Sequence, residues 1–255
     1  MGVRPWLVLP TFDEVANLEP VVRAALRALP PGARVLVVDD ASPDGTGALA
    51  DRLAGALPAV EVLHRPRRDG LGPAYLAGFA RALEGGATHV LCMDADGSHD
   101  PADLPRLLLA AERADVVLGS RYVPGGRVED WGPLRRGVSR AGAAYARGVL
   151  GLPVRDPTGG FRCLRREALE ALELPAIRSR GYAFQVELTW RALRAGLRVA
   201  ELPIVFRDRR HGRSKMTPRI AAEAVVVLPR LRREVERAPG VDDAPQELRR
   251  AGVLG

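Results

Sequence analysis

The sequence predicts an α/β fold with a mainly parallel central sheet, and three observations support this prediction. The chain has 255 residues, of which 47% are hydrophobic and 27% are charged, as is typical of a globular domain with a substantial core. Short apolar runs alternate with segments of helical periodicity in the first half of the chain. The apolar runs are nearly continuous, as expected for strands that are covered by helices on both faces.

The first half of the chain supplies most strands of this sheet and the helices between them. Apolar runs predict strands at residues 6–10, 35–38, 60–63, 89–93 and 116–118. Apolar residues at helical spacing predict helices at residues 17–29, 45–57, 72–83 and 101–112. Strands that alternate with helices of this length form βαβ units, in which the strands run parallel.

The rhythm changes after Arg121. We expect a loop from Gly125, and then a helix at 134–150, a strand at 161–164, a helix at 182–195 and a strand at 199–206. These elements complete one domain over residues 1–217. A last helical pattern at 218–238 mixes apolar residues with arginines, and the polar tail at 239–255 is expected to be flexible.

The net charge of +7 favours anionic partners, which include nucleic acids, anionic lipids and phosphorylated small molecules. The base composition of the genome explains the high arginine content equally well. Cys92 and Cys163 are too few for a disulfide framework or a cysteine metal site. No signal segment opens the chain, and the apolar stretch at 220–228 is far shorter than the ~20 residues that cross a bilayer. We therefore expect a cytoplasmic protein, which can still lie on a membrane surface.

Polar side chains follow four of the predicted strands, at residues 10–14, 39–44, 94–96 and 119–121. In an open α/β sheet, ligands bind beyond the carboxyl ends of the strands. A single cluster of this kind is explained by helix capping, as at Ser42 or Asp100. Four clusters at one edge of the sheet indicate a binding site instead.

Asp94 and Asp96 give the clearest chemical signal. Two carboxylates separated by one residue, directly after a buried strand, can reach one divalent cation. Hard cations such as Mg²⁺ favour carboxylates together with substrate phosphates and water, and a cation there would neutralise a diphosphate leaving group. Asp-x-Asp alone is more often a solvated turn. Its position after a buried strand, facing Asp39 and Asp40, favours the metal site.

Several motifs of other enzyme classes are absent from the sequence. No Gly-x-x-x-x-Gly-Lys-Ser/Thr loop occurs, and no Gly-x-Gly-x-x-Gly follows the first strand, which disfavours P-loop nucleotidases and dinucleotide oxidoreductases. No Gly-x-Ser-x-Gly elbow occurs either. None of the four histidines pairs with another at metal-ligand spacing.

Eight sequence blocks occur in an order that is typical of one family. They are PTFDE (10–14), VVDDASPDGT (37–46), GLGPAY (70–75), MDADGSH (93–99), GSRY (119–122), DPTGGF (156–161), GYAFQ (181–185) and DRRHGRSK (208–215). Together they resemble the polyprenyl- and dolichyl-phosphate mannosyltransferases of glycosyltransferase family 2, over about residues 6–217. The resemblance implies a GT-A fold, which is the Rossmann-like fold of nucleotide-diphospho-sugar transferases. It also implies transfer of mannose from GDP-mannose to a polyprenyl monophosphate, assisted by Mg²⁺ or Mn²⁺.

The resemblance further implies which residues bind the donor. The nucleotide-sugar would be bound by Pro10, Phe12, Glu14, Val38, Asp40, Asp94, Ala95 and Asp96. The metal would be bound by Asp94, Asp96 and Ser98, and the catalytic residues would be Asp94, Asp96 and Arg121. Four positions depart from the family pattern. Ser98 stands where some members carry a metal-ligating glutamine, Phe12 and Asp13 replace a Tyr-Asn pair, and Ala183 replaces a lysine near the donor. A serine reaches less far than a glutamine, so Ser98 would act through water.

The acceptor phosphate would be bound by Arg121, Arg135, Ser139, Arg209 and Lys215, which match phosphate-binding positions of the family. A polyprenyl monophosphate is already an anionic nucleophile near neutral pH. It therefore needs a cationic cradle behind the anomeric carbon rather than a strong general base, and the arginine fork suits phosphate. For each of these cations, a solvated surface charge is the alternative. In-line attack would invert the anomeric centre and give a β-linked product.

Residues 218–238 resemble the region where the family meets the membrane. Their pattern suits a helix at an anionic membrane surface, or equally an amphipathic helix packed on its own domain. The protein would then be peripheral on the inner face of the membrane. A membrane partner protein could replace the transmembrane helices that some relatives carry.

Other functions stay open. The same fold could transfer glucose from UDP-glucose to the same lipid, or act on a non-lipid acceptor, although the basic acceptor block argues against the latter. A non-catalytic protein that binds anionic ligands or nucleic acid is a more remote alternative. The chain is only 5% aromatic, and its arginines are not interleaved with aromatic residues, unlike those of single-strand readers. We therefore expect no nucleic-acid partner.

Overall fold

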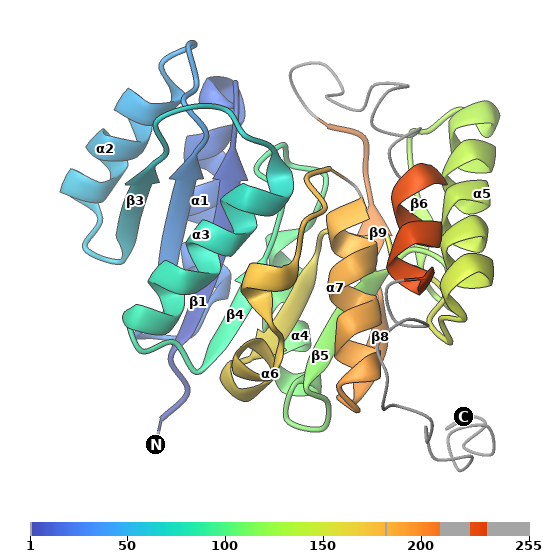
Figure 1. The fold of residues 1–255 in the computed structure, drawn as a ribbon. Helices are drawn as coiled ribbons and strands as arrows, with labels where there is room; N and C mark the ends of the chain where they lie inside the picture. Colours follow the sequence, from blue (N-terminus) through green and yellow to red (C-terminus); the bar gives the residue numbers. More distant parts are fainter. Residues whose placement is uncertain (1, 182, 210–224, 234–255) are drawn as a thin grey trace.

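The computed structural model describes residues 2–181, 183–209 and 225–233 and shows helices packed around a central sheet (Figure 1). The sheet has seven strands in the order β3-β2-β1-β4-β7-β5-β8. These strands are β1 (Pro5–Thr11), β2 (Arg34–Asp39), β3 (Val60–His64), β4 (His89–Cys92), β5 (Val116–Ser120), β7 (Arg162–Arg165) and β8 (Val199–Pro203). A separate parallel pair joins β6 (Arg127–Val128) to β9 (Val205–Phe206).

The large sheet is mainly parallel, as predicted, with one strand reversed. β7 runs antiparallel to both of its neighbours, β4 and β5, whereas the other neighbouring strands of this sheet run parallel. The predicted strand at 161–164 is therefore present, displaced by one residue. Its insertion between β4 and β5 was not predicted, because strand order depends on packing between segments that lie far apart in the sequence.

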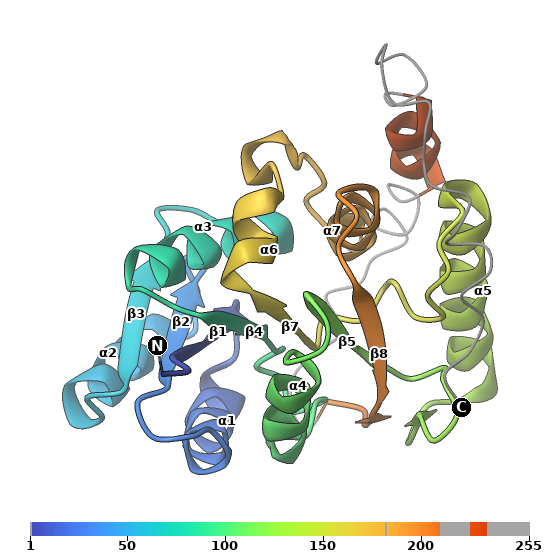
Figure 2. The same cartoon turned by 90° about the horizontal axis from the view of Figure 1, so that it is seen from below.

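Helices cover both faces of the sheet (Figure 2). One face carries α1 (Val15–Ala28), α2 (Thr46–Ala56) and α4 (Leu104–Ala110), and the other carries α3 (Leu71–Glu84), α6 (Arg166–Ala171) and α7 (Ala183–Arg194). The long helix α5 (Pro133–Leu150) lies beyond the β8 edge, close to its predicted bounds.

The strands read as continuous apolar runs because each of their faces is buried in a separate core. In β1, Trp6 and Val8 pack into the core under α3, α6 and α7. Leu7 and Leu9 pack into the core under α1, α2 and α4. Successive side chains of a strand point to opposite faces, so a strand between two cores is apolar at every position.

The observed elements depart from the prediction in a few places. The expected helix at 101–112 begins as a 3₁₀ turn at Pro101–Asp103 and continues as α4. The expected strand at 199–206 is divided into β8 and β9 at Ile204. There the chain changes partners, because the Ile204 N–H donates to the Ser120 carbonyl while the Ile204 carbonyl accepts from the Arg127 N–H. The short helix α6 was not predicted.

Residues 225–233 are helical and pack against α5. The Tyr145 hydroxyl donates to the Val225 carbonyl at 2.9 Å, and Leu228 and Leu231 are buried. The other residues of the predicted helix at 218–238, and the tail at 239–255, lie outside the described residues. Within the described part of the chain, no helix combines the length and the apolar character that a membrane span requires.

Candidate active site

A cleft of about 200 Å³ opens at the carboxyl edge of the parallel strands. Seven of the eight residues predicted to bind the nucleotide-sugar line it, namely Pro10, Phe12, Glu14, Asp40, Asp94, Ala95 and Asp96. Val38 does not line it, because this position of β2 faces the core and its side chain is fully buried there. The structure thus brings together the polar clusters that follow β1, β2 and β4.

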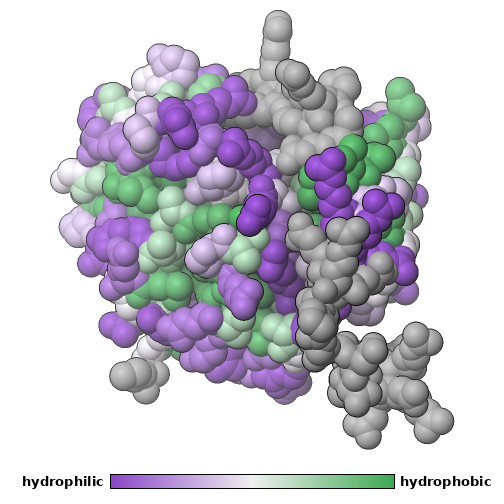
Figure 3. All heavy atoms as spheres, viewed as in Figure 1, coloured by the Kyte–Doolittle hydropathy of each residue, from purple (hydrophilic) through white to green (hydrophobic). Residues whose placement is uncertain are grey.

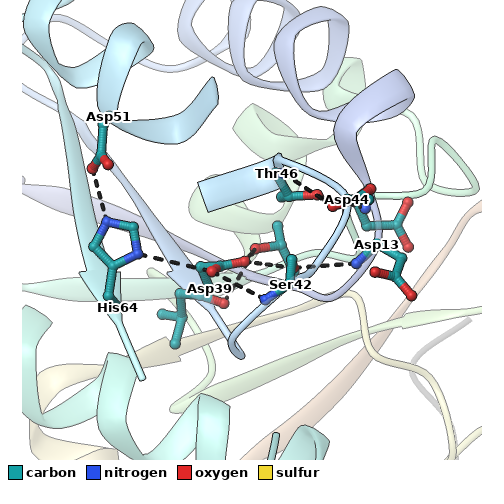
Figure 4. A network of polar contacts seen from close by, with 10 residues as sticks. Asp13, Asp39, Ser42, Asp44, Thr46, Asp51 and His64 are labelled. Carbon is teal, nitrogen blue, oxygen red and sulfur yellow. Dashed lines mark hydrogen bonds and ion pairs between the residues drawn. The ribbon is translucent and has the colours of Figure 1, made fainter. Parts of the chain in front are cut away.

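The loops after β1 and β2 are tied together by side chains (Figure 4). The Ser42 hydroxyl donates to the Asp39 carboxylate at 2.5 Å and accepts from the Asp13 N–H at 3.2 Å. Thr46 and Asp44 form a second link between these two loops. Asp13 has a φ of +54°, a left-handed conformation in which Asp and Asn are enriched among non-glycine residues. This link holds the turn that carries Phe12 against the turn that carries Asp40.

The second link joins the start of α1 to the start of α2. The Thr46 hydroxyl accepts from the Glu14 N–H at 2.9 Å, and the Asp44 carboxylate accepts from the Val15 N–H at 3.1 Å. Burial opposes ionisation of Asp44, but hydrogen bonds from Thr46 and Val15 outweigh it and lower the pKa of this carboxyl. The Asp44 carboxylate also accepts from the Thr46 N–H at 3.0 Å, so it contacts the first residue of its own helix and of the neighbouring one. The result is a fixed position for Glu14 in the cleft wall.

His64 extends this network to the edge of the sheet (Figure 4). Its Nε2 lies 2.8 Å from the Asp51 carboxylate, and its Nδ1 lies 3.8 Å from the Asp39 carboxylate. The hydrogen bond with Asp51 and the charges of both carboxylates raise the pKa of His64. The imidazole therefore links α2 to the end of β2, behind the cleft.

Asp40 organises the loop that follows β3. Its carboxylate pairs with the Arg65 guanidinium and accepts from the Asp69 and Gly70 N–H groups at 3.1 and 3.2 Å. The same loop places the Arg68 guanidinium 3.9 Å from the centre of the Phe12 ring, within the range of a cation–π contact. Arg68 also lines the cleft. It was not predicted, although its position after a third strand of the same edge was a usable signal.

Asp94 and Asp96 lie side by side in the turn after β4. The side chain of Asp94 is 36% exposed, and burial together with the neighbouring Asp96 charge raises the pKa of Asp94 to about 7. The Asp96 carboxylate lies 3.3 Å from the Arg209 guanidinium, and its other oxygen accepts from the Ser98 N–H at 3.0 Å. Among the described residues, Arg209 is the one arginine or lysine within 4 Å of this pair, and it compensates at most one of the two negative charges.

His99 contacts the turn that carries Asp94 and Asp96 through its ring. Its Nδ1 accepts a hydrogen bond from the Asp94 N–H at 3.3 Å, and its ring stacks on Phe161 with 4.9 Å between the ring centres. Burial lowers the pKa of His99 to about 4, so the imidazole is neutral near pH 7. A neutral ring with Nδ1 as an acceptor suits this contact, and we assign His99 to positioning Asp94.

The carboxylate pair fits Mg²⁺ or Mn²⁺. Among the described residues, no group of three His, Cys, Asp or Glu side chains surrounds a common metal position. Two carboxylates with excess negative charge are nevertheless the donor set expected for a cation that shares its ligands with substrate phosphate and water. Ser98 is buried and does not line the cleft, and its N–H donates to Asp96. Its predicted role as a metal ligand stays a prediction.

The residues predicted to bind the acceptor phosphate are distributed differently from the donor set. Arg209 lines the cleft beside Asp96. Arg121 is buried and forms a two-pronged ion pair with Asp156, at 2.7 and 2.8 Å. Its charge is therefore compensated within the protein, which the sequence did not indicate. Lys215 lies outside the described residues.

Arg135 and Ser139 lie on α5, beyond the β8 edge. Arg135 pairs with Asp208 at 2.7 Å and lies over the Trp131 ring at 4.0 Å. Ser139 accepts a hydrogen bond from the Tyr122 hydroxyl at 2.7 Å. Neither residue lines the cleft. Their predicted role in binding the acceptor stays a prediction.

Comparison with known proteins identifies relatives that cover nearly the whole chain. The model of the family described as glycosyl transferase family 2 matches residues 6–173. An undecaprenyl-phosphate mannosyltransferase of Micrococcus luteus is 50% identical over 224 residues, which are 88% of this chain and 92% of that protein. A polyprenol monophosphomannose synthase of Mycolicibacterium smegmatis is 46% identical over 242 residues, which are 93% of this chain and 91% of that protein.

Solved structures confirm the predicted GT-A fold. A mannosyltransferase of Pyrobaculum calidifontis, solved in complex with GDP-Man and Mn²⁺, superposes with a TM-score of 0.64 at 20% identity, covering 95% of this chain and 66% of that one. Glucosyl-3-phosphoglycerate synthase of Mycobacterium tuberculosis, solved with Mn²⁺, UDP and glucosyl-3-phosphoglycerate, superposes with a TM-score of 0.66 at 22% identity. That match covers 88% of this chain and 78% of that one. At these identities the likeness concerns the fold.

Proposed function

The chain belongs to glycosyl transferase family 2, and on this premise we propose that it transfers mannose from GDP-mannose to a polyprenyl monophosphate. Two relatives that are 46–50% identical over most of the chain are named for mannose and a polyprenyl phosphate. The observation that carries the proposal is the single cleft that joins the nucleotide-binding positions to the carboxylate pair. Its lining offers an aromatic ring that suits a base and a carboxylate pair that suits a metal and a diphosphate.

The residues divide the cleft into three parts. Phe12 offers a ring face for the nucleobase, and Asp40 offers a carboxylate at the same end. Asp94 and Asp96 would hold Mg²⁺ or Mn²⁺ against the diphosphate, and the ion would neutralise the GDP leaving group. Arg209 adds a fixed cation beside Asp96 and stabilises phosphate charge as the bond to the sugar breaks.

The reaction needs no strong base in the protein. An oxygen of the acceptor phosphate forms a bond to the anomeric carbon, while the bond from that carbon to the β-phosphate oxygen of GDP breaks. The electron pair leaves with GDP. The attacking phosphate is already ionised near pH 7, so the protein contributes alignment and charge. Attack from the side opposite to GDP inverts the anomeric centre and gives a β-linked mannosyl phosphate.

A basic and apolar face suits the lipid acceptor. Helix α5 and residues 225–233 contain seven arginines and no acidic residue. Leu134, Val138, Val225 and Val226 on this face are exposed, and hydrophobic atoms lie beside strongly hydrophilic ones in this region of Figure 3. Apolar side chains that are flanked by arginines favour binding to an anionic membrane surface. We place the enzyme at the inner face of the membrane by this surface, and a membrane partner protein stays a prediction.

An assay of the purified protein tests the proposal. It is incubated with a short polyprenyl phosphate, Mg²⁺ or Mn²⁺, and either GDP-mannose or UDP-glucose. Mass spectrometry then looks for the lipid phosphate-hexose, and NMR determines its anomeric configuration. We expect a β-linked product from GDP-mannose, lost in Asp96→Asn and kept in Asp103→Asn, which lies outside the cleft. A product from UDP-glucose alone would assign a different donor, and an α linkage would contradict the in-line mechanism.

A further inference from the structure

Both polar atoms of the Gln185 side chain, Oε1 and Nε2, are buried and have no hydrogen-bond partner among the described residues. Gln185 is only 2% exposed, yet it lines the cleft together with Asp94 and Gly160. Buried polar side chains in native proteins are nearly always paired, with protein groups, water or a ligand. A buried amide that meets the cleft with both of its polar atoms unpaired indicates a ligand contact.

The main chain of Gln185 is held firmly, whereas its side chain is not. The Gln185 carbonyl accepts from the Thr189 hydroxyl at 2.9 Å and from the Arg162 guanidinium at 3.3 Å. Arg162 is fully buried and also donates to the Gly159 carbonyl at 2.5 Å. This guanidinium therefore joins the start of α7 to the loop before β7. The backbone that carries the Gln185 amide is therefore held in place beside the cleft.

The residues that line the cleft between positions 158 and 185 are uncharged. Gly160 and Gly181 line it without side chains, and Thr158 adds a hydroxyl. A Cβ added at Gly160 would lie 3.2 Å from the Asp94 carboxylate, so glycine keeps this approach clear. Arg209, which also lines the cleft, pairs with Asp96 instead. Glycines, a hydroxyl and an amide suit a sugar, whereas a phosphate favours cations or N–H groups.

Carbohydrate hydroxyls match the amide chemically. Each sugar hydroxyl both donates and accepts, and a glutamine amide offers two donors together with a carbonyl that accepts. Phe12 and Asp40 follow β1 and β2, whereas Asp94 and Asp96 follow β4 on the other side of β1. Under the proposed function, the first pair lies at the base end of the cleft and the second pair at the diphosphate end. The hexosyl group is attached to the diphosphate and must continue from that end. The geometry points to Gln185 as a specificity-determining residue that hydrogen-bonds a hydroxyl of the donor hexosyl group, an inference that rests on the proposed function.

The substitution Gln185→Leu tests this role, since leucine nearly preserves the volume and removes every hydrogen bond. We expect kcat/KM for GDP-mannose to fall about 10- to 100-fold, while the Kd for GDP, which lacks the sugar, stays within about twofold. The midpoint of thermal unfolding should be unchanged or higher, because the substitution removes an unpaired buried amide. A purely structural glutamine would instead lower the unfolding midpoint and weaken GDP binding as well.

Deoxy donors identify the hydroxyl and complete a cycle of substrate and enzyme changes. GDP-mannose analogues that each lack one hydroxyl are assayed with the wild type and with Gln185→Leu. With the analogue that lacks the contacted hydroxyl, kcat/KM should fall strongly for the wild type and change little for the variant. Arg194→Leu, at the exposed far end of α7, serves as the control and should behave like the wild type.

The outcomes separate this inference from the proposed function. An active wild type with an equally active Gln185→Leu variant overturns the role of Gln185 and leaves the transferase assignment intact. The role of Gln185 is likewise overturned if every deoxy donor lowers kcat/KM of the wild type and of the variant by the same factor. A wild type that transfers no hexose from any nucleotide-sugar overturns the proposed function, and the inference with it.

Discussion

The ion pair between Arg121 and Asp156 allows the sharpest test of the structure. Asp156 accepts from the Arg121 N–H at 3.0 Å and from two guanidinium nitrogens at 2.7 and 2.8 Å. The side chains are 9% and 0% exposed. Burial opposes ionisation of Asp156, but the contacts from Arg121 outweigh it and lower the pKa of Asp156. The stability gained from this carboxylate is therefore present at neutral pH and is lost as the pH falls through its lowered pKa.

Asp156→Asn removes the carboxylate that pairs with the buried Arg121 guanidinium. Breaking a buried pair from one side costs about 3–5 kcal/mol, and for a chain of this size each kcal/mol lowers the unfolding midpoint by about 2–4 °C. We therefore expect a decrease of about 6–20 °C. Urea unfolding at pH 7, followed by circular dichroism, measures the free energy of unfolding of the wild type, Asp156→Asn, Arg121→Met and the double variant. The double variant should lose much less than the sum of the two single losses.

The control is the ion pair between Glu19 and Arg23, whose side chains are 44% and 47% exposed. Glu19→Gln should cost no more than about 0.5 kcal/mol. If Asp156→Asn were equally mild and the two single effects simply added, water would be screening the Arg121–Asp156 pair. The account of Arg121 as a buried structural cation would then be wrong, and its predicted contact with the acceptor phosphate would regain support.

Three further predictions follow from the site, the packing and the surface. The Asp94 carboxyl has a raised pKa of about 7, so its ionised fraction falls about tenfold from pH 8 to pH 6, and calorimetry should show about tenfold weaker Mn²⁺ binding at pH 6. In the metal-free protein, protonation of Asp94 adds stability only as the pH falls below 7. A Kd for Mn²⁺ that does not change with pH would contradict the assignment. In Gly72→Ala, the new Cβ would lie 2.3 Å from the Ser179 carbonyl oxygen, so urea unfolding should show a free energy of unfolding that is lower by about 1–3 kcal/mol. The control Gly148→Ala, whose Cβ would meet nothing within 4 Å, should be neutral or stabilising. Equal effects of the two substitutions would refute the close packing at Gly72. Leu134 on α5 is 81% exposed, and Leu134→Glu should lower co-sedimentation of the protein with anionic vesicles. Leu109 on α4 is 66% exposed, and the control Leu109→Glu should leave co-sedimentation unchanged. A loss in both variants would place the membrane contact elsewhere.

The parts of the fold that depend on local pattern were predictable. Five strands and their helices follow from nearly continuous apolar runs, because each strand lies between two cores. The carboxylates that end these strands necessarily meet at one edge, so the positions of Asp40, Asp94 and Asp96 in the cleft followed from the parallel topology. Resemblance to a known family then added Phe12 and Glu14, whose spacing alone carries little information.

The remaining features depend on contacts between distant segments. Arg121 and Asp156 are 35 residues apart, and nothing in the local sequence indicates that one neutralises the other. Val38 belongs to a sequence block shared with the family, but its place on β2 turns its side chain into the core. Arg68 and Gln185 belong to the cleft only because the loop after β3 and the start of α7 fold toward the same edge. These positions require three-dimensional packing to be recognised.

The reversed strand β7 also sets the order in which the molecule can be completed during synthesis. β3, β2, β1 and β4 pair with one another and end at Cys92, so half of the sheet can form on the ribosome at an early stage. β5 does not pair with β4 and stays without a neighbour until β7 emerges some forty residues later, at Arg162. Long-range pairing of this kind slows folding and leaves strand edges exposed. The cleft is lined by residues from both sides of this late-forming part of the sheet. The nascent chain therefore has a complete site only after the whole sheet has formed.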